Sequence, residues 1–135
     1  MLKKTKKENT ILVIEDERPL VNAVQTKLEK NGFIVTTARN VTQGLNCLQD
    51  IEGIDAIWLD HYLLGGESGL DFVAKLKSPS SKWKKLPIFV VSNTASSGNV
   101  QSYLRLGVSK YCVKAEYRLD QIVEEVKSFL KKSED

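Results

Sequence analysis

The sequence predicts an α/β fold in which a parallel sheet is covered by helices on both faces. Two observations carry this prediction. Short apolar runs alternate along the chain with longer segments whose apolar residues recur at helical spacing, as is typical of repeated βα units. The apolar runs are also continuous, whereas a strand with one face in water alternates apolar and polar residues. Five such units predict a three-layer sandwich with right-handed crossovers.

The predicted strands are short runs rich in branched and aromatic residues. They are Ile11–Ile14, Phe33–Val35, Ala56–Leu59, Ile88–Val91 and Tyr111–Val113. The third run lies within the stretch Ile54–Asp60, which Gly53 precedes and which ends abruptly in the carboxylate of Asp60. A carboxylate that ends a buried run needs a partner, since an isolated buried charge is costly.

The predicted helices follow the strands, and their apolar positions recur every three or four residues. The stripes run through Leu20–Leu28, Val41–Leu48, Leu70–Leu76, Val100–Leu104 and Leu119–Leu130. Pro19 suits the first turn of the first helix, and Gly32 lies just past its end. Asn40 and Gln43 are a predicted capping pair for the second helix.

Length and composition predict one domain. A chain of 135 residues with 41% hydrophobic and 27% charged side chains is long enough for one compact core. We expect this domain to span residues 10–132, after a basic, flexible amino-terminal tail over residues 1–9. The length leaves no room for a second domain, so we expect no output domain.

Charge and hydropathy exclude two classes of partner. The formal net charge of +3 comes largely from lysine clusters, which we interpret as solvated surface because no aromatic or helical pattern organises them for nucleic acid. The first apolar run is too short for a signal peptide, and no later run could span a bilayer. We therefore expect a cytoplasmic protein that binds neither nucleic acid nor membrane directly.

Polar side chains follow directly after the last apolar residue of four strands. They are Glu15 and Asp16 after the first strand, Asp60 after the third, Ser92 after the fourth and Lys114 after the fifth. A parallel sheet gathers such residues at its carboxyl edge. Carboxylates placed together repel unless a cation lies among them, and Mg²⁺ prefers oxygen ligands of this kind. The set suits a phosphoryl group on a carboxylate oxygen, whose charge a metal ion and a lysine would neutralise.

These residues resemble the receiver domain of two-component response regulators, and in particular the single-domain, chemotaxis-regulator-like members. The resemblance covers Thr10 to about Lys132, with the acidic pair, the acceptor, the hydroxyl and the lysine in the family's order. It implies a flavodoxin-like, doubly wound sheet of strand order 2-1-3-4-5. It also implies that Asp60 accepts a phosphoryl group from a sensor histidine kinase or a phosphotransfer protein.

The resemblance assigns further roles residue by residue. Asp16 and Asp60 would bind Mg²⁺ directly, Glu15 would act through a water molecule, and the backbone carbonyl of Tyr62 would complete the protein ligands. Such a domain is a signalling phosphoacceptor rather than an enzyme, although it partly catalyses its own phosphorylation and dephosphorylation.

The switch residues Ser92 and Tyr111 would report the phosphoryl group to a downstream protein target. Ser92 would donate a hydrogen bond to the phosphoryl group, and Lys114 would pair with it. Tyr111 matches the aromatic residue that turns inward on activation and alters the surface formed by the fourth helix, fifth strand and fifth helix. That surface is a candidate for a phosphorylation-dependent dimer.

The chain departs from the family pattern at several positions. Ala115 follows Lys114 where the family usually has proline in a cis peptide, so a cis bond is not expected. Leu64 stands where a proline is common, and Asn93 stands where a small residue is common. These departures leave open a pseudo-receiver, a binding module that keeps the fold without being switched by phosphorylation.

Two other interpretations also remain open. In the first, Glu15 and Asp16 are only first-turn acids, which the dipole of the following helix favours. The second is an aspartyl-phosphate phosphatase. Enzymes that resemble the haloacid-dehalogenase type carry a second acid two residues after the nucleophile, and Tyr62 at that position weakens this interpretation. His61, the single histidine, is expected to be an incidental loop residue, because neighbouring strand side chains point to opposite faces.

Overall fold

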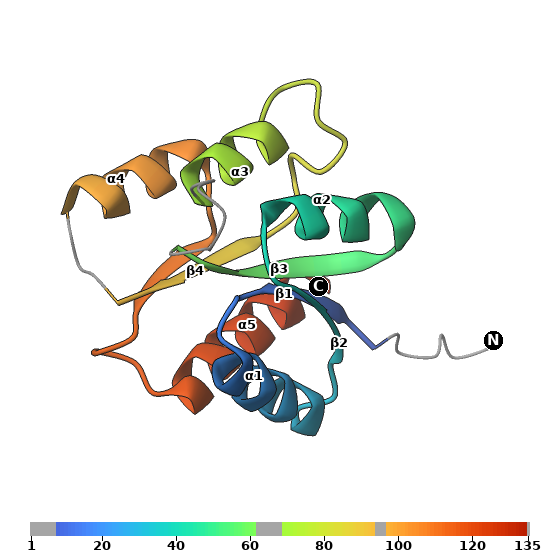
Figure 1. Ribbon diagram of the computed structural model, residues 1–135, viewed down its shortest axis with the longest axis vertical. Coiled ribbons are helices and arrows are strands. Elements are labelled where there is room, and N and C mark those ends of the chain that lie inside the picture. The colour runs from blue at the N-terminus through green and yellow to red at the C-terminus, as the bar shows by residue number, and fades with distance from the viewer. Residues whose placement is uncertain (1–7, 62–68, 94–96, 135) are drawn as a thin grey trace.

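One parallel sheet organises the chain (Figure 1). The computed structural model describes residues 8–61, 69–93 and 97–134. The sheet has the strand order β2-β1-β3-β4-β5, and every neighbouring pair is parallel. Its strands are β1 (Thr10–Ile14), β2 (Ile34–Ala38), β3 (Ile54–Asp60), β4 (Ile88–Ser92) and β5 (Lys110–Val113). The predicted strand order 2-1-3-4-5 is confirmed.

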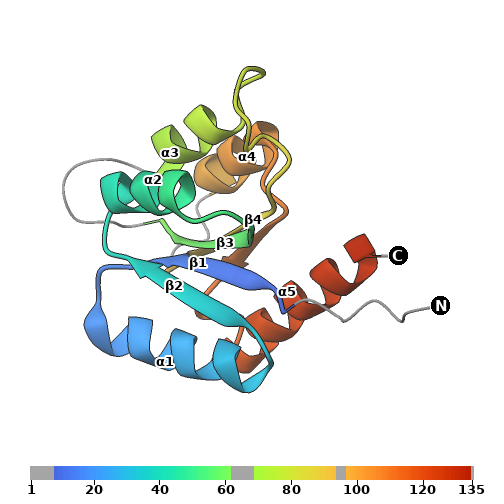
Figure 2. The same cartoon turned by 90° about the vertical axis from the view of Figure 1, so that its right-hand side faces the viewer.

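Helices cover both faces of the sheet (Figure 2). The described residues form α1 (Arg18–Lys30), α2 (Val41–Asp50), α3 (Gly69–Leu76), α4 (Ser97–Leu106) and α5 (Leu119–Glu134). Helices α1 and α5 lie on one face, and α2, α3 and α4 lie on the other. The predicted three-layer sandwich is therefore confirmed.

The two cores explain why the strand sequences are apolar without alternation. On β1, Ile11 and Val13 pack in the core shared with α1 and α5, whereas Leu12 and Ile14 pack in the core shared with α2, α3 and α4. All four side chains are at most 1% exposed. Because successive strand residues point to opposite faces, a strand buried on both faces needs apolar residues at every position.

Strand β2 differs most from its prediction. The sequence predicts a strand over Phe33–Val35, but the observed strand is Ile34–Ala38, and Phe33 is buried just before it. It lies at the edge of the sheet and pairs only with β1 among the described strands. An edge strand is partly exposed to water, which explains why polar Thr36 and Thr37 belong to it and why Ile34 is 49% exposed.

The ends of the first two helices agree with the predicted signals. Pro19 lies in the first turn of α1, and Gly32 just past its end has a φ of 87°, which favours glycine. The Asn40 side chain accepts a hydrogen bond from the Gln43 N–H at 2.8 Å. The Gln43 side chain accepts one from the Arg39 N–H at 2.9 Å, so the two side chains cap the start of α2 together.

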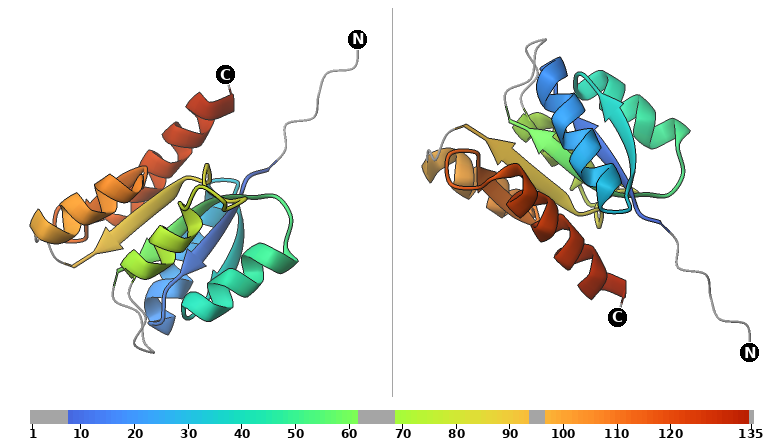
Figure 3. Two further views of the ribbon diagram at one scale, coloured as in Figure 1. Left: turned by 90° about the horizontal axis from the view of Figure 1, so that it is seen from above. Right: turned by 90° about the horizontal axis from the view of Figure 1, so that it is seen from below.

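The carboxyl ends of the strands meet at one edge of the sheet, toward which the strand arrows point in Figure 3. Backbone pairing continues one residue past three of these ends. Glu15 N donates to Ala38 O at 3.0 Å, and His61 N donates to Val91 O at 3.1 Å. Lys114 N donates to Ser92 O at 2.7 Å. The polar residues that follow the strands are therefore held by the sheet itself.

Within residues 8–61, 69–93 and 97–134, no helix has both the length and the apolar composition needed to cross a bilayer.

The cap of α2 gives a test of the fold. Asn40→Ala removes the oxygen that accepts from Gln43 N–H, and we expect it to lower the free energy of unfolding by about 1 kcal/mol. Urea unfolding measures this loss. Asn40→Asp keeps an acceptor oxygen and serves as the control. Equal stability of the alanine and aspartate variants would show that the side-chain cap does not stabilise the protein.

Candidate functional site

Three carboxylates come together at the carboxyl edge of the sheet. Glu15 and Asp16 follow β1, and Asp60 is the last residue of β3, the strand that pairs with β1. One oxygen from each of the three lies within 4.8 Å of the others. The sequence thus locates this cluster correctly, because parallel neighbouring strands end at the same edge.

Two of these carboxylates are almost fully buried. Glu15 is 1% exposed and Asp60 is 5% exposed, whereas Asp16 is partly exposed. The Glu15 carboxylate accepts hydrogen bonds from Asp16 N–H at 3.0 Å and Glu17 N–H at 3.2 Å. These bonds hold its Oε2 toward the backbone. First-turn acids on a solvated helix would be exposed, so the helix-dipole interpretation does not account for Glu15.

Lys114 provides the positive charge of the cluster. Its Nζ lies 3.6 Å from Asp60 Oδ1 and 3.7 Å from Glu15 Oε1. The lysine comes from the end of β5, whose backbone is fixed to Ser92. One ammonium group thus faces both buried carboxylates.

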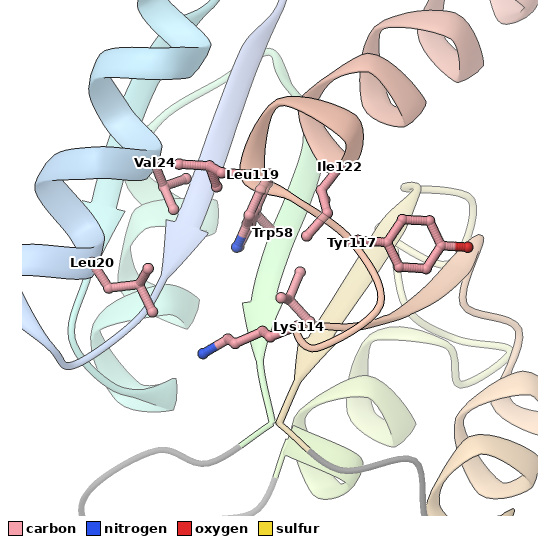
Figure 4. A pocket seen from close by; sticks show the side chains of 8 residues that line it. Leu20, Val24, Trp58, Lys114, Tyr117, Leu119 and Ile122 are labelled. Atoms are coloured by element: carbon pink, nitrogen blue, oxygen red, sulfur yellow. The ribbon is translucent and has the colours of Figure 1, made fainter.

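The stem of Lys114 lies along an apolar cavity of about 180 Å³ (Figure 4). Leu20 and Val24 of α1 line one side, and Leu119 and Ile122 of α5 line the other. The ammonium group is turned away from Tyr117, which also lines the cavity. Apolar walls of this kind hold the methylene chain and leave the charged end to the acids.

Burial controls the protonation of Glu15. Removal from water raises the pKa of Glu15 to about 8, and the negative charge of Asp60 acts in the same direction. The Glu17 N–H and the Lys114 ammonium act in the opposite direction but are weaker. Without a cation, burial and the Asp60 charge therefore favour the protonated form of Glu15.

The predicted hydroxyl lies on the neighbouring strand. Ser92 is the last residue of β4, is fully buried, and pairs with Val113. Asp60 pairs with Val91, the residue before it. Ser92 is therefore one strand from Asp60, at the same edge of the sheet.

The predicted switch residue Tyr111 lies in β5 and is half-buried. Its ring centroid is 5.7 Å from that of Tyr103 on α4, and the planes are tilted by 44°. Tyr62, whose backbone carbonyl is a predicted metal ligand, lies outside the described residues, as does Leu64.

The structure describes two of the positions that depart from the family pattern, Asn93 and Ala115. Asn93 is exposed to water. No cis peptide bond occurs among the described residues, so the bond between Lys114 and Ala115 is trans, as expected from the absence of proline.

His61 lies just past the end of β3, as a loop residue would, but its ring is not incidental because two side chains of α4 contact it. Its Nδ1 lies 2.6 Å from the Tyr103 hydroxyl, and its Nε2 lies 3.3 Å from the Asn99 side-chain nitrogen. Strand alternation did predict that His61 and Asp60 point apart. Sequence reasoning missed that two polar side chains of α4, Asn99 and Tyr103, reach the His61 ring on the face of the sheet away from Asp60. Asn99 and Tyr103 are four residues apart, which puts them on one face of a helix.

Comparison with known proteins agrees with the fold. The family model of the response regulator receiver domain matches residues 11–127. The chain therefore belongs to the response regulator receiver family. A related curated protein is the phosphate regulon transcriptional regulatory protein PhoB of Escherichia coli (strain K12). It is 30% identical over 122 residues, which are 90% of this chain and 52% of PhoB.

Solved structures share the fold. A CheY-like response regulator receiver domain protein from Methanospirillum hungatei JF-1 has a TM-score of 0.83 at 21% identity, with 95% of this chain and 98% of that chain covered. A two-component response regulator from Clostridium difficile has a TM-score of 0.84 at 19% identity, with 95% and 100% covered. The chain spans about half the length of the curated relatives it matches.

The buried Glu15 predicts a pH dependence of stability. In the unfolded chain its proton leaves near its ordinary pKa of 4.5, whereas in the folded protein it stays until about pH 8. Between these values the folded state binds more protons, so the contribution of Glu15 is complete below 4.5 and falls as the pH rises through 8. We expect the metal-free protein to lose unfolding free energy over this range, as urea unfolding in EDTA would measure.

Glu15→Gln is the control for that measurement. It keeps an oxygen that can accept from the Asp16 and Glu17 N–H groups but has no proton to lose. We expect its stability to fall less steeply than that of the wild type between pH 4.5 and 8. Parallel pH profiles of the two proteins would contradict the assigned pKa.

Proposed function

We propose that this receiver accepts a phosphoryl group on Asp60 from a phosphohistidine of a sensor kinase or phosphotransfer protein, in a Mg²⁺-dependent reaction. The observation that carries the proposal is the almost fully buried carboxylate of Asp60, which Lys114 approaches at 3.6 Å within a cluster of three acids. A structural aspartate would need only a partner, whereas this one lies among like charges. Such crowding suits a site that binds a cation and an anion together.

The donor set fits Mg²⁺. Glu15, Asp16 and Asp60 offer hard carboxylate oxygens within 4.8 Å of one another, and the partly exposed Asp16 leaves an open side. These three residues would hold the ion, with Asp16 and Asp60 as direct ligands and Glu15 acting through water. When bound, the ion neutralises charge on the acids and on phosphoryl oxygens.

Residues of this chain perform the transfer by position and charge. An Asp60 oxygen attacks phosphorus, the new O–P bond forms as the donor's P–N bond breaks, and the donor imidazole keeps the electron pair. Lys114 is placed to neutralise the charge spread over the phosphoryl oxygens. The buried Ser92 hydroxyl is placed on the next strand to donate a hydrogen bond. The same groups would serve the hydrolysis of the acyl phosphate, so the domain partly catalyses both steps.

The signal would leave through a protein surface. We place it on α4, β5 and α5, with Ser92 and Tyr111 as the residues that respond to the phosphoryl group. The partners would be a cytoplasmic phosphohistidine donor and a downstream protein, and the same face is the candidate for a phosphorylation-dependent dimer. PhoB is named as a transcriptional regulator, but only about half of its length corresponds to this chain. We propose no direct contact with nucleic acid or membrane for the receiver itself.

Intact mass after incubation with acetyl phosphate and Mg²⁺ tests the proposal. We expect one added phosphoryl group on the wild type, and none on Asp60→Asn or in EDTA. Asp55→Asn is the matched control, because Asp55 lies on the same strand but at its other end, where it accepts from Thr10 N–H at 2.8 Å. It should take up the group as the wild type does.

Failure of the wild type to gain mass, in protein that unfolds cooperatively, would contradict the proposal. Failure to bind beryllofluoride as well would favour the pseudo-receiver, a binding module that phosphorylation does not switch. An adduct that persists in Asp60→Asn would place the acceptor elsewhere.

A further inference from the structure

The exit of β3 is attached to α4 through one imidazole ring. His61 directly follows Asp60, and both of its ring nitrogens face side chains of α4. Nδ1 lies 2.6 Å from the Tyr103 hydroxyl, and Nε2 lies 3.3 Å from Nδ2 of Asn99. The two rings also meet edge to face, with centroids 5.4 Å apart and planes at 82°. Side chains one helical turn apart thus hold one ring from both sides.

The protonation of the ring follows from its partners. A neutral imidazole has one nitrogen that donates and one that accepts. The Asn99 amide nitrogen is a donor, so Nε2 accepts from it. Nδ1 therefore carries the hydrogen and donates to the Tyr103 oxygen. Each of these hydrogen bonds has a defined direction.

The Tyr103 hydroxyl lies in a closed space. Tyr103 is 0% exposed, although it ends in a polar group. A Cβ added to Gly69, the first residue of α3, would overlap this hydroxyl oxygen and would lie 3.4 Å from Cδ2 of Leu59. The absence of a side chain at Gly69 therefore makes room for the hydroxyl. A buried tyrosine at this place needs its hydrogen bonds, because an unpaired buried hydroxyl is costly.

The same ring reaches the predicted switch residue. Tyr103 packs at 5.7 Å against Tyr111 of β5, and both belong to the core beneath α2, α3 and α4. A continuous set of contacts thus runs from the residue after Asp60, through α4, to Tyr111.

We propose that His61, Tyr103 and Asn99 form a clasp that couples the phosphoacceptor to α4 and Tyr111. They are positioning residues and do not touch the reacting atoms. This inference rests on the proposed function of Asp60 for its role in signalling, while the clasp itself holds α4 in the resting protein.

The backbone provides the link between Asp60 and the clasp. Asp60 and His61 share one planar peptide, and their side chains point to opposite faces of the sheet. The His61 N–H is held by Val91 O at 3.1 Å, so β4 restrains this peptide. A displacement of the Asp60 backbone toward a bound cation or phosphoryl group would therefore pass through this peptide to the imidazole that α4 holds.

Tyr103→Phe tests the clasp in the resting protein, because it removes the hydroxyl and keeps the buried ring. Loss of one such hydrogen bond should speed hydrogen exchange of α4 amides about three- to tenfold, as mass spectrometry would measure. Exchange in α2 should not change. Tyr117→Phe is the matched control, since Tyr117 lines the cavity of Figure 4 and packs against the core shared with α1 and α5, on the opposite face of the sheet from Tyr103. Equal α4 exchange in the two variants would overturn the clasp.

A double variant tests whether His61 and Tyr103 act through each other. His61→Leu should also speed α4 exchange, and the combination with Tyr103→Phe should add little beyond either single change. Additive effects would show that the two residues stabilise α4 independently, which would contradict the clasp.

Beryllofluoride with Mg²⁺ tests the coupling to Asp60. We expect this phosphoryl mimic to change α4 exchange in the wild type and in Tyr117→Phe. In Tyr103→Phe it should still bind, but the change in α4 should be at least halved. An undiminished α4 response in Tyr103→Phe would overturn the coupling. Failure of the mimic to bind the wild type would overturn the proposed function and the coupling together, while the resting exchange would still decide whether the clasp exists.

Discussion

The close approach of three carboxylates at one edge of the sheet is the constraint on which the rest of this structure depends. Glu15 and Asp60 are almost fully buried, and their oxygens lie within 4.8 Å of each other and of an Asp16 oxygen. Like charges so placed are unstable unless they are neutralised. The Lys114 ammonium offsets part of this charge, and burial raises the pKa of Glu15 to about 8, which favours its protonated form. We infer that a bound cation would replace that proton.

The fold makes this arrangement possible because the sheet, rather than loops, positions the charged groups. Glu15, Ser92 and Lys114 each follow or end a strand whose backbone pairing continues to that point. The apolar residues of these strands pack in two cores, one on each face. Their burial, at roughly 1.5–3 kcal/mol for each large side chain, offsets the cost of desolvating the acids. A single peptide then joins the site on one face to His61 and α4 on the other.

The sequence was sufficient for most of the fold and for the acidic cluster, because both follow from local patterns. Continuous apolar runs predicted β1, β3 and β4, and a carboxylate directly after such a run predicted its place at the edge. The extent of β2 was missed because an edge strand accepts threonines such as Thr36. The contact of His61 with Tyr103 was missed because it joins residues 42 positions apart, and neither residue carries a local signal of the other. The carbonyl of Tyr62 lies outside the described residues.

The most direct test of this account is calorimetry of Mg²⁺ binding at pH 7 in two buffers that differ in their enthalpy of protonation. The difference in heat counts the protons released. We predict that the wild type binds Mg²⁺ with release of about one proton, since Glu15 holds a proton until about pH 8, and that Glu15→Gln releases far less. Binding that releases no proton, or no binding by the wild type, would contradict the claim that a cation replaces the proton in the buried acidic cluster.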